Sequence, residues 1–185
     1  MRRVSVTWAV ILFGALGSLG ATGFEVHPDR QGPSYEVPFY TGSIFPTPKE
    51  AQYFDEFVPL SRVGVVLGNG IAKDDPRLTF LFERIVRFGG DFEVLDAANG
   101  EFDSFIMVGD TSDTETLCPR NAPQQPEGYL LFPSEKDGVP VIVLKGSDSL
   151  GIIWAITAFN QLVGKQNGRA VVRKAMVFDY PDAPG

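Results

Sequence analysis

A helix is predicted in the first half of the chain from four apolar residues at helical spacing: Leu78, Leu81, Phe82 and Ile85. Asp75 followed by Pro76 is a typical helix start, because Asp caps free N–H groups and Pro suits the first helical position. Gly89-Gly90 marks the expected end of the helix. The pattern therefore indicates an amphipathic helix that begins near Pro76 and buries one face.

A second helix is predicted from another apolar stripe: Ile152, Ile156, Phe159 and Val163. Ser147 or Asp148 is expected to cap this helix, and Gly164 to end it. A further apolar row runs beside the stripe: Trp154, Ala158 and Leu162. Because no charged residue occurs between Ser149 and Gly164, we expect a largely buried helix with Trp154 in the core.

Six stretches rich in apolar residues are predicted to be strands: 62–67, 92–95, 102–108, 128–132, 139–144 and 171–178. Residues 97–100 are expected to join the second and third of them, and Asp137-Gly138 to be the turn of a hairpin formed by the fourth and fifth. The run 141–144 is apolar on both faces, which is typical of a central strand. Residues 109–127 are expected to form a long polar loop. This order predicts an α+β fold: a mixed β-sheet with two helices packed on one face.

The chain is expected to begin with a signal peptide at residues 1–23. Arg2 and Arg3 precede an apolar run, and cleavage after Gly20 and cleavage after Gly23 fit equally well. An uncleaved membrane anchor is the alternative. Residues 24–43, rich in Pro, Gly and Ser, are expected to be a flexible mature N-terminus, followed by a domain at 44–178 and a linker at 179–185. We therefore expect an exported protein, secreted or periplasmic.

The net charge of the chain limits the classes of partner, and its cysteine content limits how the fold can be stabilised. The net charge is −7, and removal of the leader, with two of the 16 basic residues and none of the 23 acidic ones, would make it −9. This balance argues against nucleic acid and anionic membrane surfaces as partners. Cys118 is the single cysteine, so no internal disulfide can form. Folding is therefore expected to rest on packing.

Three polar motifs in the chain are better explained as turns, helix caps or solvated side chains than as binding sites for phosphate or metal ions. Gly68-Asn69-Gly70 follows a strand but lacks the further residues of a phosphate-binding loop, so we expect a turn. The acidic residues of the long loop lack the glycine and the distal Glu of a calcium loop, so we expect solvated side chains: Asp110, Asp113 and Glu115. Asp74-Asp75 is interpreted as a helix cap.

No catalytic, metal-binding or cofactor-binding residue is assigned from the sequence, and no cofactor is expected. Cys118 and His27 are the only candidates for a thiol–imidazole pair, but nothing positions His27, and one His with one Cys cannot build a zinc site. Tyr129 and Phe159, like Trp154, are expected to be core residues rather than sugar-stacking platforms. The role of Tyr180, which lies in the linker, stays open.

Four segments carry a resemblance to a known type of domain: 44–50, with its Pro-x-Pro, Pro126-Glu127-Gly128-Tyr129, the helix at 151–162, and Asp179-Tyr180-Pro181-Asp182-Ala183-Pro184-Gly185. Together they resemble the N-terminal accessory domain of hexosaminidase-type glycoside hydrolases, of families 20 and 84 and their relatives. In those enzymes such a segment leads into a catalytic (β/α)8 barrel, which holds the Asp-Glu or Asp-Asp pair.

The resemblance implies a non-catalytic N-terminal domain of an exported glycoside hydrolase that acts on N-acetylhexosamine-type or related glycans. The barrel is expected C-terminal to Gly185, and no catalytic residue falls within this chain, so the chain alone is expected to be inactive. An apolar patch is expected where the barrel docks, at or near Tyr180, Pro181 and Pro184. The alternative is a free-standing exported carbohydrate-binding or protein-interaction module.

Overall fold

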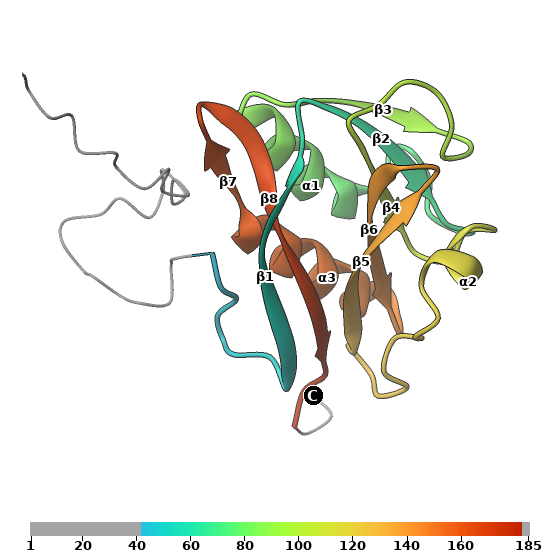
Figure 1. Ribbon diagram of the computed structural model, residues 1–185. Helices are drawn as coiled ribbons and strands as arrows, with labels where there is room; N and C mark the ends of the chain where they lie inside the picture. Colours follow the sequence, from blue (N-terminus) through green and yellow to red (C-terminus); the bar gives the residue numbers. More distant parts are fainter. Residues whose placement is uncertain (1–41, 183–185) are drawn as a thin grey trace, which may run out of the picture.

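The computed structural model describes residues 42–182 (Figure 1), in which eight strands and three helices follow one another. The predictions for the signal peptide, for most of the mature N-terminus, for His27 and for Pro184 lie outside the described residues. The elements in chain order are β1 (Glu50–Pro59), β2 (Arg62–Leu67), α1 (Pro76–Arg87), β3 (Asp91–Leu95), β4 (Ser104–Val108), α2 (Thr114–Leu117), β5 (Tyr129–Lys136), β6 (Val139–Gly146), α3 (Ser149–Leu162), β7 (Val163–Gln166) and β8 (Arg169–Asp179).

The strands form one mixed sheet with the order β1-β8-β5-β6-β4-β2-β3, and β7 pairs with β8 off this path. Strands β3, β2, β4 and β6 pair with one another in parallel, whereas β5 pairs with β6 and with β8, and β8 with β1, in antiparallel fashion. The apolar strand β6 lies in the middle of the sheet, as predicted. The hairpin β5–β6 also forms as predicted, and Asp137 and Gly138 at its turn have φ angles of 52° and 83°.

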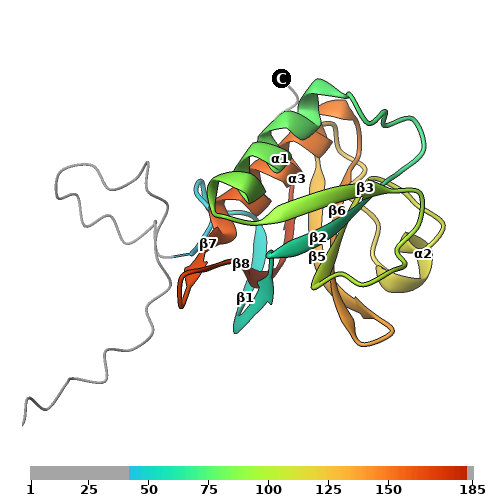
Figure 2. The ribbon, with the colours of Figure 1, turned by 90° about the horizontal axis from the view of Figure 1, so that it is seen from above.

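Helices α1 and α3 lie side by side on one face of the sheet (Figure 2). The main core fills the space between them and the sheet, with Leu78, Ile85 and Phe159 among its members. The α+β class with two helices on one face is therefore confirmed. The sheet also buries residues on its opposite face, where a second cluster contains Phe105, Met107 and Cys118.

The segment 109–127 covers that opposite face, which differs from the long polar loop predicted. Its one-turn helix α2 begins with Thr114, which is buried and whose hydroxyl donates to the Thr111 carbonyl at 2.9 Å. Leu117, Cys118 and Ala122 pack against the sheet from this segment. The apolar residues are too few and too irregularly spaced to produce a periodic signal, so the sequence pattern did not reveal this second layer.

Both predicted helix starts are confirmed. Asp75 accepts a hydrogen bond from the Arg77 N–H at 2.9 Å, and Asp148 accepts one from the Gly151 N–H at 2.8 Å. Helix α3 ends at Leu162 with Val163 as its C-cap, so Gly164 directly follows the end of the helix; Val163, predicted to belong to the helix, already pairs with Val172 as the first residue of β7. The chain thus passes directly from helix to strand.

Two strands, β1 and β7, were not predicted. The pairing of β1 with β8 shifts register between Tyr53 and Phe57, so the alternation of β1 is broken, and β7 has only four residues. Residues 97–100 lie in the connection between β3 and β4, as predicted, and β2 lies between these two strands in the sheet and pairs with both in parallel. Between residues 42 and 182, no helix is both long and apolar enough to cross a membrane.

Candidate functional site

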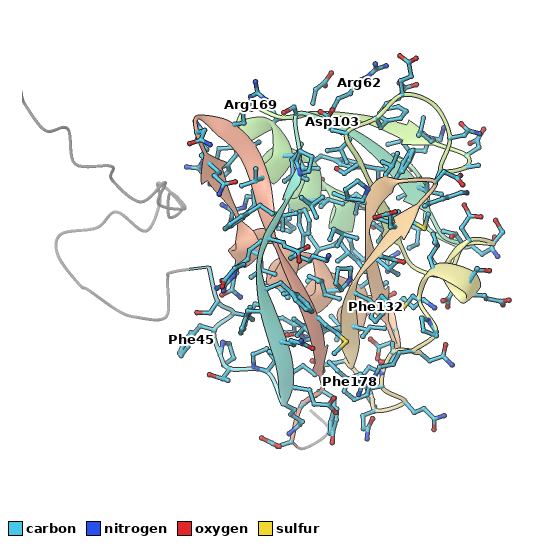
Figure 3. The ribbon with its side chains drawn as sticks, in the orientation of Figure 1. Phe45, Arg62, Asp103, Phe132, Arg169 and Phe178 are labelled. Carbon is cyan, nitrogen blue, oxygen red and sulfur yellow. The ribbon has the colours of Figure 1, made fainter. Side chains whose placement is uncertain are left out.

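A mainly apolar groove of about 140 Å³ lies where the chain leaves β8. We call it the exit groove. Four parts of the chain line it: the segment before β1, the outer side of α3, the residues around the start of β5, and the end of β8 with the two residues after it. The lining residues are Ile44, Phe45, Pro46, Trp154, Thr157, Ala158, Gln161, Glu127, Tyr129, Asp179, Tyr180 and Pro181. Figure 3 shows Phe45 at the outer edge of the molecule, and half of this side chain is exposed.

Trp154 is a wall of the exit groove, and the prediction that it belongs to the core is wrong. The residue is 45% exposed, whereas Phe159 on the same helix is fully buried, as predicted. Its indole Nε1 donates a hydrogen bond to Glu127 Oε2 at 3.1 Å. The prediction failed because the absence of charged residues on α3 indicates only that its surface is apolar. The sequence of the helix does not show whether other residues of this chain bury that surface. Tyr129 is buried, as predicted, although it reaches the floor of the groove.

The segment Pro126-Glu127-Gly128 is held against the start of α3, and this positions the Glu127 carboxylate beside Trp154. The Glu127 N–H donates to Asp148 Oδ2 at 2.9 Å, and the Ser147 N–H donates to the Gly128 carbonyl at 2.8 Å. Glu127 adopts a φ of 60°, a left-handed conformation that is uncommon for a residue other than glycine. The sequence signal for this position was the Pro126-Glu127-Gly128-Tyr129 motif.

Asp148 therefore serves two elements at once, and removing its side chain is expected to destabilise the domain. The hydrogen bonds donated by the backbone N–H groups of Glu127 and Gly151 hold the pKa of this carboxyl below its usual range. The Asp148 carboxylate therefore contributes its full stabilisation above the pKa of an Asp side chain in the unfolded protein, about 4. This stabilisation is lost as the pH falls through the lowered pKa of Asp148 in the folded protein. We expect Asp148→Ala to cost about 1–2 kcal/mol at neutral pH, measured by urea unfolding.

The matched control is Asp148→Asn, which keeps a capping oxygen and should cost less than the alanine variant. The difference in stability between wild type and Asp148→Ala should shrink when the measurement is repeated in acid. An equal difference at neutral and acid pH would contradict this role of the carboxylate.

The segment after β8 is fixed to the domain rather than free. Asp179 Oδ1 accepts a hydrogen bond from the Lys49 N–H at 3.1 Å, and Lys49 also pairs with Asp182. The Tyr180 ring packs edge-on against Phe178 with 6.3 Å between centroids, and Lys49 Nζ lies 4.8 Å from the centre of the Tyr180 ring. Asp179 also lies close to the hydroxyl of Tyr129. Burial, together with this nearby carboxylate, raises the pKa of Tyr129 far above its usual value. Tyr180, whose role was open, is thus part of the groove.

The glycine motif 68–70 and two of the three acidic residues weighed in the long loop have structural partners. The glycine motif is a turn, because the Ile71 N–H donates to the Gly68 carbonyl at 3.2 Å, and the N–H groups of Gly68 and Asn69 donate to the carbonyls of Val108 and Asp110 at 2.7 and 3.1 Å. Asp110 pairs with Lys145, Asp113 pairs with Lys136, and Glu115 is exposed on α2.

Of the residues considered for metal binding or thiol chemistry, those in the described part of the chain have defined structural surroundings. Within residues 42–182, no three His, Cys, Asp or Glu side chains are placed to hold a metal ion. Cys118 is buried, its Sγ lies 3.1 Å from the Arg120 carbonyl, and burial raises the pKa of its thiol. Asp75, the confirmed cap, has its pKa lowered to about 2, chiefly by the Arg77 side chain that it accepts hydrogen bonds from.

The sequence matches no protein-family profile, and no curated protein matches it at a significant level. Solved structures of the GH84 and GH20 families do share its fold. CpGH84D aligns with a TM-score of 0.58 and 18% identity, over 82% of this chain and 24% of that chain. A beta-N-acetylhexosaminidase from Bacteroides fragilis aligns with a TM-score of 0.52 and 19% identity, over 76% of this chain and 25% of that chain.

A GH20 exo beta-N-acetylglucosaminidase from Vibrio harveyi aligns with a TM-score of 0.51 and 16% identity, over 75% of this chain and 19% of that chain. This chain therefore corresponds to a quarter or less of each of these neighbours. The resemblance stated from the sequence is confirmed at the level of the fold.

Proposed function

We propose that this chain is the non-catalytic N-terminal domain of an exported glycoside hydrolase that acts on N-acetylhexosamine-type or related glycans. Residues 44–178 are the domain, residues 1–23 the signal peptide, and residues 179–185 the start of a linker to a catalytic (β/α)8 barrel. The observation that carries the proposal is the shared fold, which in CpGH84D and the Bacteroides fragilis hexosaminidase occupies about a quarter of a longer chain.

The exit groove supports this proposal, because it is a mainly apolar surface beside the segment that would lead to the barrel. The outer side of α3 exposes Leu150 and Trp154, and Phe45 is exposed across the groove from α3. Large apolar side chains that gather on one face typically mark a contact with another protein or domain. We assign this face to the barrel, since Tyr180 and Pro181 line the groove and the following residues start there.

We expect the purified chain, by itself, to show no glycosidase activity. Glycosidases need two carboxyl groups that flank the scissile bond, and in our proposal both belong to the barrel. The measurement is hydrolysis of an aryl N-acetylglucosaminide. Turnover that disappears when an acidic residue of this domain is changed to its amide would refute the assignment.

We expect Trp154→Ala to weaken docking without unfolding the domain. The side chain is about half exposed, so its truncation should cost less than about 1 kcal/mol in the isolated chain. The reading frame beyond residue 185 is first examined for a continuation of barrel length. The barrel is then produced separately, and its affinity for this chain is measured with and without the substitution.

Phe80→Ala is the matched control, because Phe80 is an exposed aromatic residue of α1 that does not line the exit groove. It should leave the affinity unchanged, whereas Trp154→Ala should lower it at least tenfold, the range of interface anchors. Equal effects of the two substitutions would contradict docking at the groove.

A free-standing carbohydrate-binding module is the second candidate, and the composition of the exit groove favours it. The half-exposed indole of Trp154 lies among the carboxylates of Glu127 and Asp179, a combination of stacking surface and hydrogen-bond acceptors that suits a sugar. Binding of chito-oligosaccharides to the purified chain, abolished in Trp154→Ala at an unchanged melting temperature, would select this function over the first.

A further inference from the structure

A second concave site lies on the molecule at the carboxyl ends of β4 and β6. We call it the Lys145 crevice; it is a space of about 330 Å³ lined by Asp110, residues 121–124 and residues 145–147. It shares no lining residue with the exit groove. Its surroundings are polar, in contrast to the mainly apolar walls around Trp154.

The topology of the sheet explains why a crevice forms here. Strands β4 and β6 are parallel neighbours, so their carboxyl ends meet at one edge. The chain leaves β4 toward α2, which covers one face of the sheet, and leaves β6 toward α3, which covers the other. Adjacent connections that diverge in this way open a space between them, and in α/β sheets such spaces are the usual place for a bound ligand.

Two charged residues line this crevice, Lys145 and Asp110, and Lys145 is the buried one, with a side chain that is 5% exposed. It follows Val141 and Val143 on the side of β6 that packs under segment 109–127. Its Nζ lies 3.1 Å from Asp110 Oδ1, but the Asp110 side chain is 82% exposed. A buried ammonium pays a desolvation penalty, and a carboxylate that is mostly in water offsets little of it.

The remaining polar side chains of the crevice are neutral. Ser147 carries a hydroxyl, and Asn121 and Gln124 carry amides, and all three residues are exposed. Each of these groups can donate a hydrogen bond. Apart from the exposed Asp110 carboxylate, the crevice therefore combines a buried cation with neutral donors, a composition that binds the oxygens of an anion, whereas a cation site would need several converging carboxylates or carbonyls.

We propose that the Lys145 crevice binds a small oxyanion, a carboxylate or a sulfate, with Lys145 as the principal contact and Ser147, Asn121 and Gln124 as neutral donors. The anion takes the place of Asp110 beside the ammonium. The space exceeds what one such group fills, so the group can be a free ion or a substituent on a ligand of monosaccharide size. This proposal does not depend on the barrel or on the function of the exit groove.

The test is a titration of the purified, isotopically labelled chain with sulfate, with glucuronate and with glucose, at an ionic strength held constant with chloride. We expect saturable shifts of the backbone amides of Gly146, Ser147 and residues 121–124 with the anions, and none with glucose. Tighter binding of glucuronate than of sulfate identifies a sugar-borne carboxylate as the better ligand; the reverse order identifies the free oxyanion. Shifts spread evenly over the surface, or no saturation with either anion, overturn the proposal.

Three substitutions make the test specific. Lys145→Met should abolish the saturable shifts, and Lys136→Met, which removes a lysine paired with Asp113 elsewhere, should leave them unchanged. Asp110→Asn should tighten binding about two- to fivefold, because it removes the exposed carboxylate that competes for the ammonium. Asp110 is exposed, so this variant keeps the test decisive even if Lys145→Met fails to fold. Unchanged or weaker anion binding by Asp110→Asn refutes the competition and with it the proposal.

Discussion

Phe159→Ala is expected to lower the free energy of unfolding by about 3–5 kcal/mol, the usual cost of truncating a buried aromatic residue. Phe159 lies on α3, its side chain is completely buried, and it belongs to the main core between the helices and the sheet. Its removal leaves a cavity that the surrounding strands can fill only in part. Urea unfolding followed by circular dichroism measures the loss as a shift of the midpoint at a constant slope.

Trp154→Ala provides the comparison within the same helix. Both changes remove a large aromatic side chain from α3 at sites five residues apart in sequence, but the indole is 45% exposed. We expect the two stability losses to differ by at least about 2 kcal/mol, with Phe159→Ala the larger. Similar losses at the two positions would mean that the indole is buried in the protein in solution.

Gly151→Ala is expected to destabilise the domain by about 2–3 kcal/mol, although alanine is the better helix former by about 1 kcal/mol. A Cβ at this position would lie 2.3 Å from the Gly128 carbonyl oxygen and 3.0 Å from the Gly146 Cα. Both contacts are with backbone, so neither can be relieved by turning a side chain. Residue 151 is thus glycine because the Glu127–Gly128 segment crosses α3 there. Thermal unfolding of the variant measures the effect.

Thr79→Ala is the matched control for the effect of alanine in a helix. Thr79 is exposed on α1, and its replacement should raise the stability by up to about 0.7 kcal/mol. The two substitutions to alanine therefore carry opposite signs. A gain in stability from Gly151→Ala would show that the segment 126–128 does not press on α3 in solution.

The local signals in the sequence were sufficient to place both long helices and the central hairpin. Asp75-Pro76 and Asp148 are caps whose effect depends on neighbours within a few residues, and Asp137-Gly138 sets its turn in the same way. Such features can be found from sequence because the interactions that cause them are short in range. The pairing of β1 with β8 depends on contacts between distant residues, and the bulge in β1 removed its periodic signal.

The candidate sites were beyond the reach of the same reasoning, for two different physical reasons. The uncharged sequence of α3 indicates burial, but a sequence does not distinguish burial within one chain from burial against a second domain, and Trp154 was therefore placed in the core. Lys145 lies in an apolar strand and was given no role. Its importance comes from the depth to which the fold buries it, which is a property of the packed segment 109–127.

The position of β8 inside the sheet constrains the order in which the domain can fold. This last strand lies between β1 and β5, so the sheet cannot close until β8 has been made. The hydrogen bond between Lys49, just before β1, and Asp179, at the end of β8, joins residues that are 130 positions apart in the sequence. Closing so long a loop is slow. The domain therefore keeps an open gap in its sheet until β8 has paired with β1 and β5. Shortening the chain before β8 should leave separate, aggregation-prone sheet edges rather than a smaller stable domain.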